Sequence, residues 1–115
     1  MPVSHVNERE TRPVAAPGVR NVLKQIVVGP GDGWQGWVMR RFTLRDRGYT
    51  PRHRHPWPHV MYVLSGQGVF FLEGKEYAME PGSFAFVPPD AEHQFTSTAP
   101  DDLIFLCIVP EEGDK

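Results

Sequence analysis

Frequent proline and glycine residues are the feature that most constrains how this chain can fold. The sequence has 12 prolines and 11 glycines in 115 residues. Both residue types interrupt helices, and the apolar stretches between them are short and rich in β-branched and aromatic side chains, which is typical of strands joined by turns. The pattern therefore predicts an all-β sandwich or barrel with little helix.

The apolar stretches mark the positions of the expected strands. About eight to ten short antiparallel strands are expected, which is the number in a jelly roll. Side chains alternate between the two faces of a strand, so Arg40 lies on the same face as Val38 and Phe42. The expected strands are 22–28, 37–44, 59–65, 69–72, 77–79, 84–87, 93–96 and 103–109, with a loop at 45–50.

The length of the chain suits one domain with a single core. Residues 1–20 contain prolines and scattered charges without any period. We interpret them as an N-terminal arm that is partly disordered or docks along a sheet edge. Residues 21–115 are expected to form the single domain, so any site has to be built within one small barrel.

Composition argues against several function classes. The formal net charge is −2 and no long basic block is present, so nucleic acid is not an expected partner. No apolar run has the length of a membrane span, and the polar N-terminus does not resemble a signal peptide. The single cysteine, Cys107, cannot form an internal disulfide. A cytoplasmic protein with a small-molecule substrate is expected.

Four of the five histidines are concentrated in two places. His53, His55 and His59 lie within seven positions, and His93 follows a turn sequence further along. Residues i and i+2 of an extended chain point the same way, and the prolines after His55 interrupt the strand, so His59 can turn toward the same point. A single histidine on a strand is more often a hydrogen-bonded or surface residue, but four converging neutral imidazoles suit Mn, Fe, Co, Ni, Cu or Zn. His5, in the polar arm, is expected to be solvated.

These residues resemble the two sequence motifs of the cupin superfamily. The first motif runs from a glycine through His-x-His to a carboxylate ligand and a second glycine; the second runs from a glycine through Pro-x-Gly to a histidine and an asparagine. The matching positions are Gly48, His53, His55, His59 and Gly66 in the first motif, and Gly82, Pro88, Asp90, His93 and Ser97 in the second. The chain departs from the motifs in the gap after Gly48, which is one residue short, and at Asp90, Ser97 and His59, which replace a glycine, an asparagine and the carboxylate.

A four-histidine site is a known variant within the superfamily, and the chain is similar to small single-domain manganese cupins. The shared stretches, within a likeness over residues 20–113, are Val38-Met39-Arg40, His53 to His59 and Phe105-Leu106-Cys107. The resemblance implies the cupin fold, a double-stranded β-helix or jelly-roll barrel. It also implies one divalent transition metal per chain, with Mn(II) expected first and Fe(II) next, while ligand type alone leaves Cu, Ni, Co and Zn open. The implied metal ligands are His53, His55, His59 and His93.

An oxidoreductase is the expected function. Four neutral imidazoles leave the full charge on the ion, and open positions on it are typical of catalytic sites. This favours dioxygenase-like oxidation, or cleavage of a C–C or C=C bond, in a small organic substrate. The alternatives are a non-redox isomerase or decarboxylase, and a metal-dependent binding module without turnover. Small cupins commonly dimerise by exchanging N-terminal strands, so the resemblance also implies a homodimer.

A few further residues are expected around the metal. Arg40 either faces the barrel interior, where it steers an anionic ligand, or forms a surface salt bridge. Phe105 lines an apolar wall. Cys107, on the same strand face, is a small buried hydrophobe, or else it faces the metal and is exposed to oxidation. Asp90 or Glu92 is a candidate to orient an imidazole.

Overall fold

The computed structural model describes residues 3–114 and confirms the predicted all-β fold. Its nine strands are β1 (Arg12–Pro13), β2 (Arg20–Val28), β3 (Trp37–Tyr49), β4 (His59–Ser65), β5 (Gly68–Leu72), β6 (Lys75–Met79), β7 (Phe84–Val87), β8 (His93–Ser97) and β9 (Leu103–Pro110). The 3-10 turns are η1 (Val6–Glu8), η2 (Pro30–Asp32) and η3 (Glu111–Asp114). Within this part of the chain there is no α-helix, and no helix is long and apolar enough to cross a membrane.

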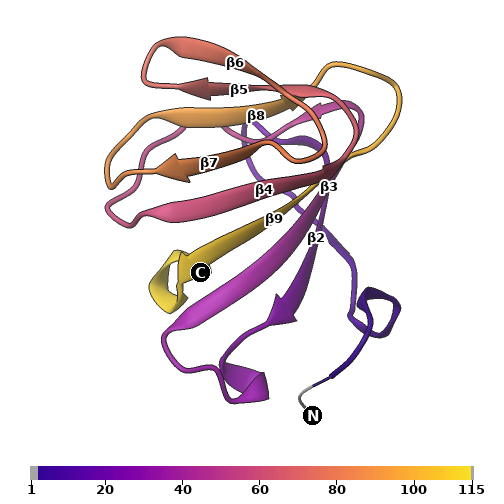
Figure 1. The fold of residues 1–115 in the computed structure, drawn as a ribbon, viewed down its shortest axis with the longest axis vertical. Coiled ribbons are helices and arrows are strands. Elements are labelled where there is room, and N and C mark those ends of the chain that lie inside the picture. Colours follow the sequence, from indigo (N-terminus) through magenta and orange to yellow (C-terminus); the bar gives the residue numbers. More distant parts are fainter. Residues whose placement is uncertain (1–2, 115) are drawn as a thin grey trace.

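The strands form one antiparallel sheet that curls into a nearly closed barrel (Figure 1). The strand order is β6-β5-β8-β3-β9-β4-β7, with β2 paired to β3 and β1 to β2. Figure 1 shows β5, β6 and β8 at the top of the barrel and β4, β9, β3 and β2 below them. β3 and β4 follow each other in sequence but are separated in space, because β9 lies between them. This is the predicted jelly-roll barrel.

β3 is longer than predicted and lies between β8 and β9 in the sheet. A loop was expected at 45–50, but the strand continues to Tyr49 and reaches β8 at its far end. Asp46 and Arg47 have φ angles of 38° and 57°, which bend the strand without ending it. A Cβ atom on Gly48 would lie 2.6 Å from a carbonyl oxygen of β2, so only glycine fits there. The loop prediction was wrong because it took the bend for a break.

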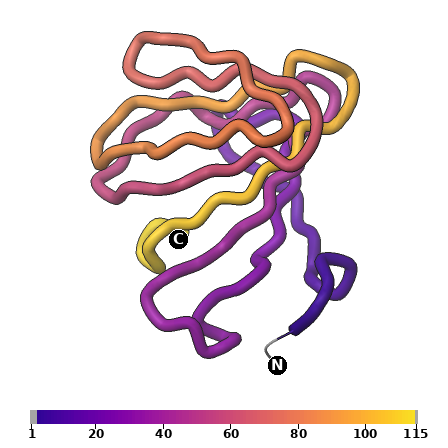
Figure 2. The backbone as a smooth tube through the Cα atoms, in the orientation of Figure 1, coloured from indigo at the N-terminus to yellow at the C-terminus, as the bar shows by residue number. Residues whose placement is uncertain are grey.

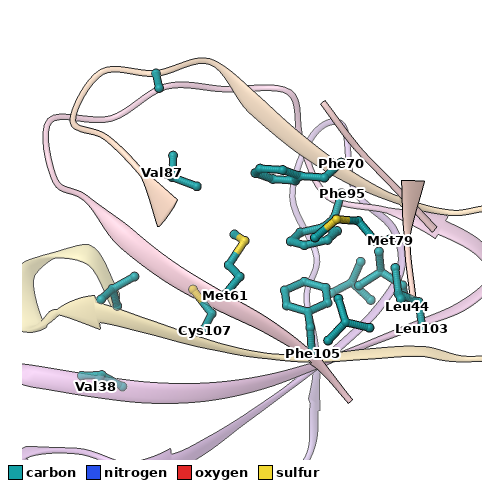
Figure 3. Packing of buried hydrophobic residues seen from close by; sticks show 14 residues of the cluster. Val38, Leu44, Met61, Phe70, Met79, Val87, Phe95, Leu103, Phe105 and Cys107 are labelled. Carbon is teal, nitrogen blue, oxygen red and sulfur yellow. The ribbon is translucent and has the colours of Figure 1, made fainter. Parts of the chain in front are cut away.

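The inward-facing side chains pack into one apolar core with stacked phenylalanines at its centre (Figure 3). Phe95 packs between Phe70 and Phe105, with ring centroids at 4.6 and 4.1 Å. Leu44 and Leu103 are fully buried beside them. Removal of this apolar area from water is the main force that closes the barrel.

The N-terminal arm docks against the barrel along β2 (Figure 2). β1 pairs with β2, which extends the sheet at that edge. The carbonyl oxygens of Val6 and Arg9 accept hydrogen bonds of 2.8 and 3.2 Å from Nε2 of the buried Gln25 side chain. Docking along a sheet edge is therefore the arrangement observed, while the boundary between arm and domain at residue 20 stays a prediction.

The outer surface of β4 and β7 carries exposed apolar side chains. Val60, Tyr62 and Leu64 of β4 are 45%, 47% and 42% exposed. Phe86 and Phe84 of β7 are paired with the first two and are 58% and 74% exposed. A contiguous apolar patch of this kind is often an interaction surface.

Candidate metal centre

The structure brings His53, His55, His59 and His93 together at one end of the barrel. Donor atoms of His53, His55 and His93 all lie within 4.8 Å of one another. His59 joins this set through its Nε2 atom, which lies 3.1 Å from His93 Nε2, and its ring centroid lies 4.8 Å from that of His55. The four rings therefore converge on one region.

Main-chain hydrogen bonds hold the histidine segment in place. His53 and His93 form an isolated antiparallel bridge with N–O distances of 3.2 and 3.0 Å. The Asp90 amide donates to the His55 carbonyl oxygen at 2.8 Å. His59 is the first residue of β4, so it is positioned by the sheet. Two segments far apart in sequence are thus fixed against each other independently of the side chains.

Backbone carbonyls set the orientation of two of the rings. His93 Nδ1 donates to the Ala91 carbonyl oxygen at 2.8 Å, and His55 Nδ1 donates to that of Trp57 at 3.0 Å. A carbonyl oxygen only accepts, so each Nδ1 carries the proton and each Nε2 presents a lone pair. Neither Asp90 nor Glu92, the two acidic candidates for this role, accepts a hydrogen bond from these two rings.

Cys107 connects the histidine cluster to Arg40. Its sulfur lies 3.3 Å from His59 Nδ1 and accepts a hydrogen bond of 3.1 Å from Arg40 Nη2. Cys107 is fully buried, and burial raises the pKa of its thiol against the opposing effect of Arg40. Arg40 and Cys107 are direct partners across β3 and β9, so Arg40 faces the barrel interior. The inward position is that of the first predicted alternative, while a role in steering an anionic ligand stays a prediction. Cys107 is buried and also makes these two polar contacts.

The contact between His59 and His93 tests whether this cluster suits a metal ion. The Nε2 atom of His93 presents a lone pair, so the contact is either a hydrogen bond donated by His59 or a pair of lone pairs facing one cation. Adjacent ligands at right angles on metal–nitrogen bonds of about 2.1 Å would be about 3.0 Å apart. The observed 3.1 Å fits two ligands of one ion.

Burial keeps the histidines neutral. Loss of hydration lowers the pKa of His59 to about 2 and that of His93 to about 4, and the nearby histidines add to both shifts. Burial also lowers the pKa values of His53 and His55. Neutral imidazole is the form that binds metals, so the cluster is ready to act as a ligand set at neutral pH.

A cavity of about 460 Å³ adjoins the cluster. The histidines line one side of it, and the remaining wall includes Val22, Phe42, Met61, Phe95 and Phe105. The Trp57 ring, also in the wall, stacks on the His55 ring at 4.7 Å with an interplanar angle of 12°. Figure 3 shows Met61 of β4 next to Cys107 of β9, which is its cross-strand partner, and Phe105 further along β9. The volume and the mixture of apolar walls with a few polar groups suit a small organic molecule.

Two charged residues near this cavity were missed from the sequence. Lys24 lies in the wall, and its Nζ atom is 2.8 Å from Oδ1 of Asp114 in η3. The same oxygen is 3.7 Å from Arg40 Nη1. Lys24 shares the inward face of β2 with Val22, so strand alternation could have identified it. Asp114 follows the last strand in a segment without any period and gave no such signal.

The sequence is similar to a known protein family and to proteins of known activity. A family model described as the cupin domain matches residues 40–109. The 1-methylthio-D-xylulose 5-phosphate methylsulfurylase of Rhodospirillum rubrum is 31% identical over 96 residues, which cover 84% of this chain and 60% of that protein. The acireductone dioxygenase of Bacillus thuringiensis is 36% identical over 71 residues, covering 56% of this chain and 42% of the enzyme. The chain thus matches only about half the length of these relatives.

Solved structures match nearly the whole chain. The polyketide cyclase RemF from Streptomyces resistomycificus superimposes with a TM-score of 0.88 at 28% identity, covering 96% of this chain and 79% of that one. A cupin-2 domain protein from Rhodospirillum rubrum has a TM-score of 0.85 at 23% identity, with 95% and 74% coverage. The second likeness shows the fold alone, and both match the barrel that carries the histidines.

Proposed function

The chain belongs to the cupin domain family, and on that premise we propose that it is a metal-dependent oxidoreductase acting on a small organic substrate. The proposed reaction is a dioxygenase-like oxidation, or cleavage of a C–C or C=C bond. The proposed ligands of one divalent ion are His53, His55, His59 and His93. The observation that carries the proposal is the convergence of the histidine donors: those of His53, His55 and His93 lie within 4.8 Å of one another, and His59 Nε2 lies 3.1 Å from His93 Nε2.

Mn(II) is the proposed ion and Fe(II) the second choice. Four imidazoles contribute no negative charge, so the ligand set does not favour a higher oxidation state. Both ions accept nitrogen ligands, although Cu and Zn bind such sites more tightly and compete wherever they are available. A bound ion of this kind would supply a Lewis acid and a redox centre beside the substrate.

The residues around the histidines have separate tasks in this proposal. The aromatic rings of Trp57 and Phe105 exclude water and hold the apolar part of the substrate. Cys107 supports His59 from the side opposite its Nε2 atom. Arg40 supplies a fixed positive charge at the wall, which orients an anionic substrate group.

The resemblance to acireductone dioxygenase supports the oxygen-dependent reaction. The 36% identity over 71 residues is the highest among the relatives described above. A non-redox reaction is the second candidate, supported by the TM-score of 0.88 with a polyketide cyclase over 96% of this chain. In that case the ion would act only as a Lewis acid. A binding module without turnover is the remaining alternative.

Anaerobic metal reconstitution followed by oxygen-uptake assays tests the proposal. The protein is loaded separately with Mn(II), Fe(II) or Zn(II), and each form is presented with diketones, catechols and styrene-like phenols. Uptake with Mn(II) or Fe(II), but not with redox-inert Zn(II), would support the oxidoreductase. If elemental analysis shows one bound ion per chain and no form takes up oxygen, the result would contradict the oxidoreductase and favour the non-redox enzyme or the binding module.

We also propose that the protein is a cytoplasmic homodimer without nucleic-acid or membrane partners. The exposed patch on β4 and β7, which includes Phe84 and Phe86, supports a dimer. β1 pairs with β2 of its own chain, so an exchange of N-terminal strands would replace contacts already made. Light scattering that reports a monomer at micromolar concentration would reject the dimer.

A further inference from the structure

Two cations lie close together at the wall of the cavity, on neighbouring strands. Lys24 of β2 pairs with Phe42, and Arg40 of β3 pairs with Ile26, so the two cations are diagonal neighbours on the inward face. Both line the cavity that the histidines share. Their side chains are 25% and 13% exposed. Cations are seldom this buried without a partner.

One carboxylate serves both cations. Asp114 Oδ1 lies 2.8 Å from Lys24 Nζ and 3.7 Å from Arg40 Nη1. These approaches have the distances of ion pairs without the directions of hydrogen bonds, and the buried Nε atom of Arg40 has no hydrogen-bond partner within residues 3–114. Two positive charges therefore share a single negative one, which leaves a net charge of one and a free N–H donor.

The geometry points to an anion-binding subsite formed by Lys24 and Arg40, which Asp114 fills when no substrate is bound. We propose that its ligand is a small carboxylate with an apolar body, which takes the place of Asp114. The inference deepens the proposed function, because it assumes that the histidine cavity is the substrate site. A carboxylate is chosen because the group seated there is itself a carboxylate, and Arg and Lys bind such groups strongly.

The rest of the cavity agrees with this class of ligand. Arg40 is joined to His59 by two contacts through the Cys107 sulfur, of 3.1 and 3.3 Å. Phe42 and Phe105 stack with ring centroids 5.4 Å apart, and both line the cavity. An anion seated on the cations therefore has aromatic walls for its body and the histidine cluster within the same cavity.

Carboxylate binding by the metal-free protein tests the inference without using the metal. Benzoate is titrated at pH 7.5 by calorimetry, and neutral benzamide serves as the matched probe. Benzoate is expected to bind at least about tenfold more tightly than benzamide, which corresponds to the loss of one charged contact. Equal affinities for the two probes would overturn the subsite.

Substitution of the internal carboxylate is the sharper measurement. Asp114→Asn removes the competitor and leaves both cations, so benzoate affinity should rise by about tenfold. Glu112→Gln, an exposed acidic residue of the same turn, is the control and should change it little. An unchanged or weaker affinity in Asp114→Asn would refute the displacement.

Loss of either cation should have the opposite effect. Lys24→Gln should weaken benzoate binding by about tenfold, whereas Lys75→Gln on the exposed β6 should not. Arg40→Gln gives the same prediction, but Arg40 also contacts Cys107, so Lys24→Gln and Asp114→Asn carry the test if it fails to fold. Absence of oxygen uptake in the loaded enzyme would count against the proposed function alone, since these titrations involve no metal.

Discussion

Along β9, the inward-facing side chains change from Leu103 and Phe105 at one end of the barrel to Cys107 at the other. Around Phe105 the interior holds stacked aromatic rings, which also form one wall of the cavity. Around Cys107 it holds an arginine, a histidine and an adjoining cavity. The same strands therefore build a packed end, which we term the phenylalanine end, and a polar end, which we term the histidine end.

The difference shows how the barrel supports buried polar groups. A buried imidazole or guanidinium without partners destabilises a protein. At the histidine end these groups are hydrogen-bonded to backbone carbonyl oxygens and to the Cys107 sulfur. The phenylalanine end needs no such partners and gains stability from the apolar area it buries. The aromatic stack and the buried polar groups therefore lie in different parts of one barrel.

The largest effect is expected from a substitution at the phenylalanine end. Phe95→Ala removes the middle ring of the stack and leaves a cavity, so the free energy of unfolding should fall by about 3–5 kcal/mol. Urea denaturation measures the change. The variant that remains folded should still bind one metal ion per chain; loss of metal from folded protein would show that the two ends are not separate.

Substitution of a histidine should act on metal binding rather than on stability, which is the reverse of the pattern expected for Phe95→Ala. His93→Ala removes a proposed ligand and should lower metal affinity by about 100-fold or more, because ligands contribute at least as much as the groups that orient them. His59→Ala should behave alike, and His5→Ala, in the arm, should have no effect. Elemental analysis after dialysis measures the metal. Full retention in both cluster variants would remove the basis for the four-histidine site.

Acidification should weaken the histidine end in the metal-free protein. The pKa values of His59 and His93 are lowered to about 2 and about 4, while an unfolded histidine titrates near 6.5. Between these values the unfolded chain binds more protons, so stability is fully present above about pH 6.5 and falls as the pH decreases. A loss of about 1–2 kcal/mol per histidine between pH 6.5 and 5 is expected in urea denaturation.

The matched variant for this pH dependence is His93→Gln, which keeps a polar side chain but does not titrate. Its stability should fall less steeply over the same range of pH. A slope identical to that of the unsubstituted protein would mean that His93 is protonated in the folded state, contrary to the lowered pKa.

The smallest effect is expected at the boundary between the two ends. Cys107→Ala removes the sulfur that contacts His59 Nδ1 and Arg40 Nη2, so metal affinity should fall by about tenfold. Cys107→Ser keeps a hydrogen-bonding atom and should recover part of it. Competition with a chromophoric chelator measures both. Equal affinity in all three proteins would make Cys107 a packing residue only.

Local patterns predicted most of the barrel. Short stretches bounded by turn residues identified the strands that carry His59, Phe84 and His93, because both the stretches and the turns are visible locally in the sequence. The bend of β3 was missed, since left-handed conformations at Asp46 and Arg47 depend on how that strand crosses between the two parts of the sheet. The carbonyl oxygens of Ala91 and Trp57 were also missed, because every residue has one and only the fold selects which is used.

By itself, the sequence determined that this chain is an all-β protein with histidines at cupin motif positions, since strand period and residue type are local properties. Only the tertiary structure decided that Arg40 faces inward, that Cys107 touches His59, and that Asp114 reaches Lys24. These contacts join residues that are far apart in the chain, and they form because barrel closure brings β2, β3, β9 and η3 together. Local sequence does not show which distant residues come into contact, because those contacts are decided by how the strands pack.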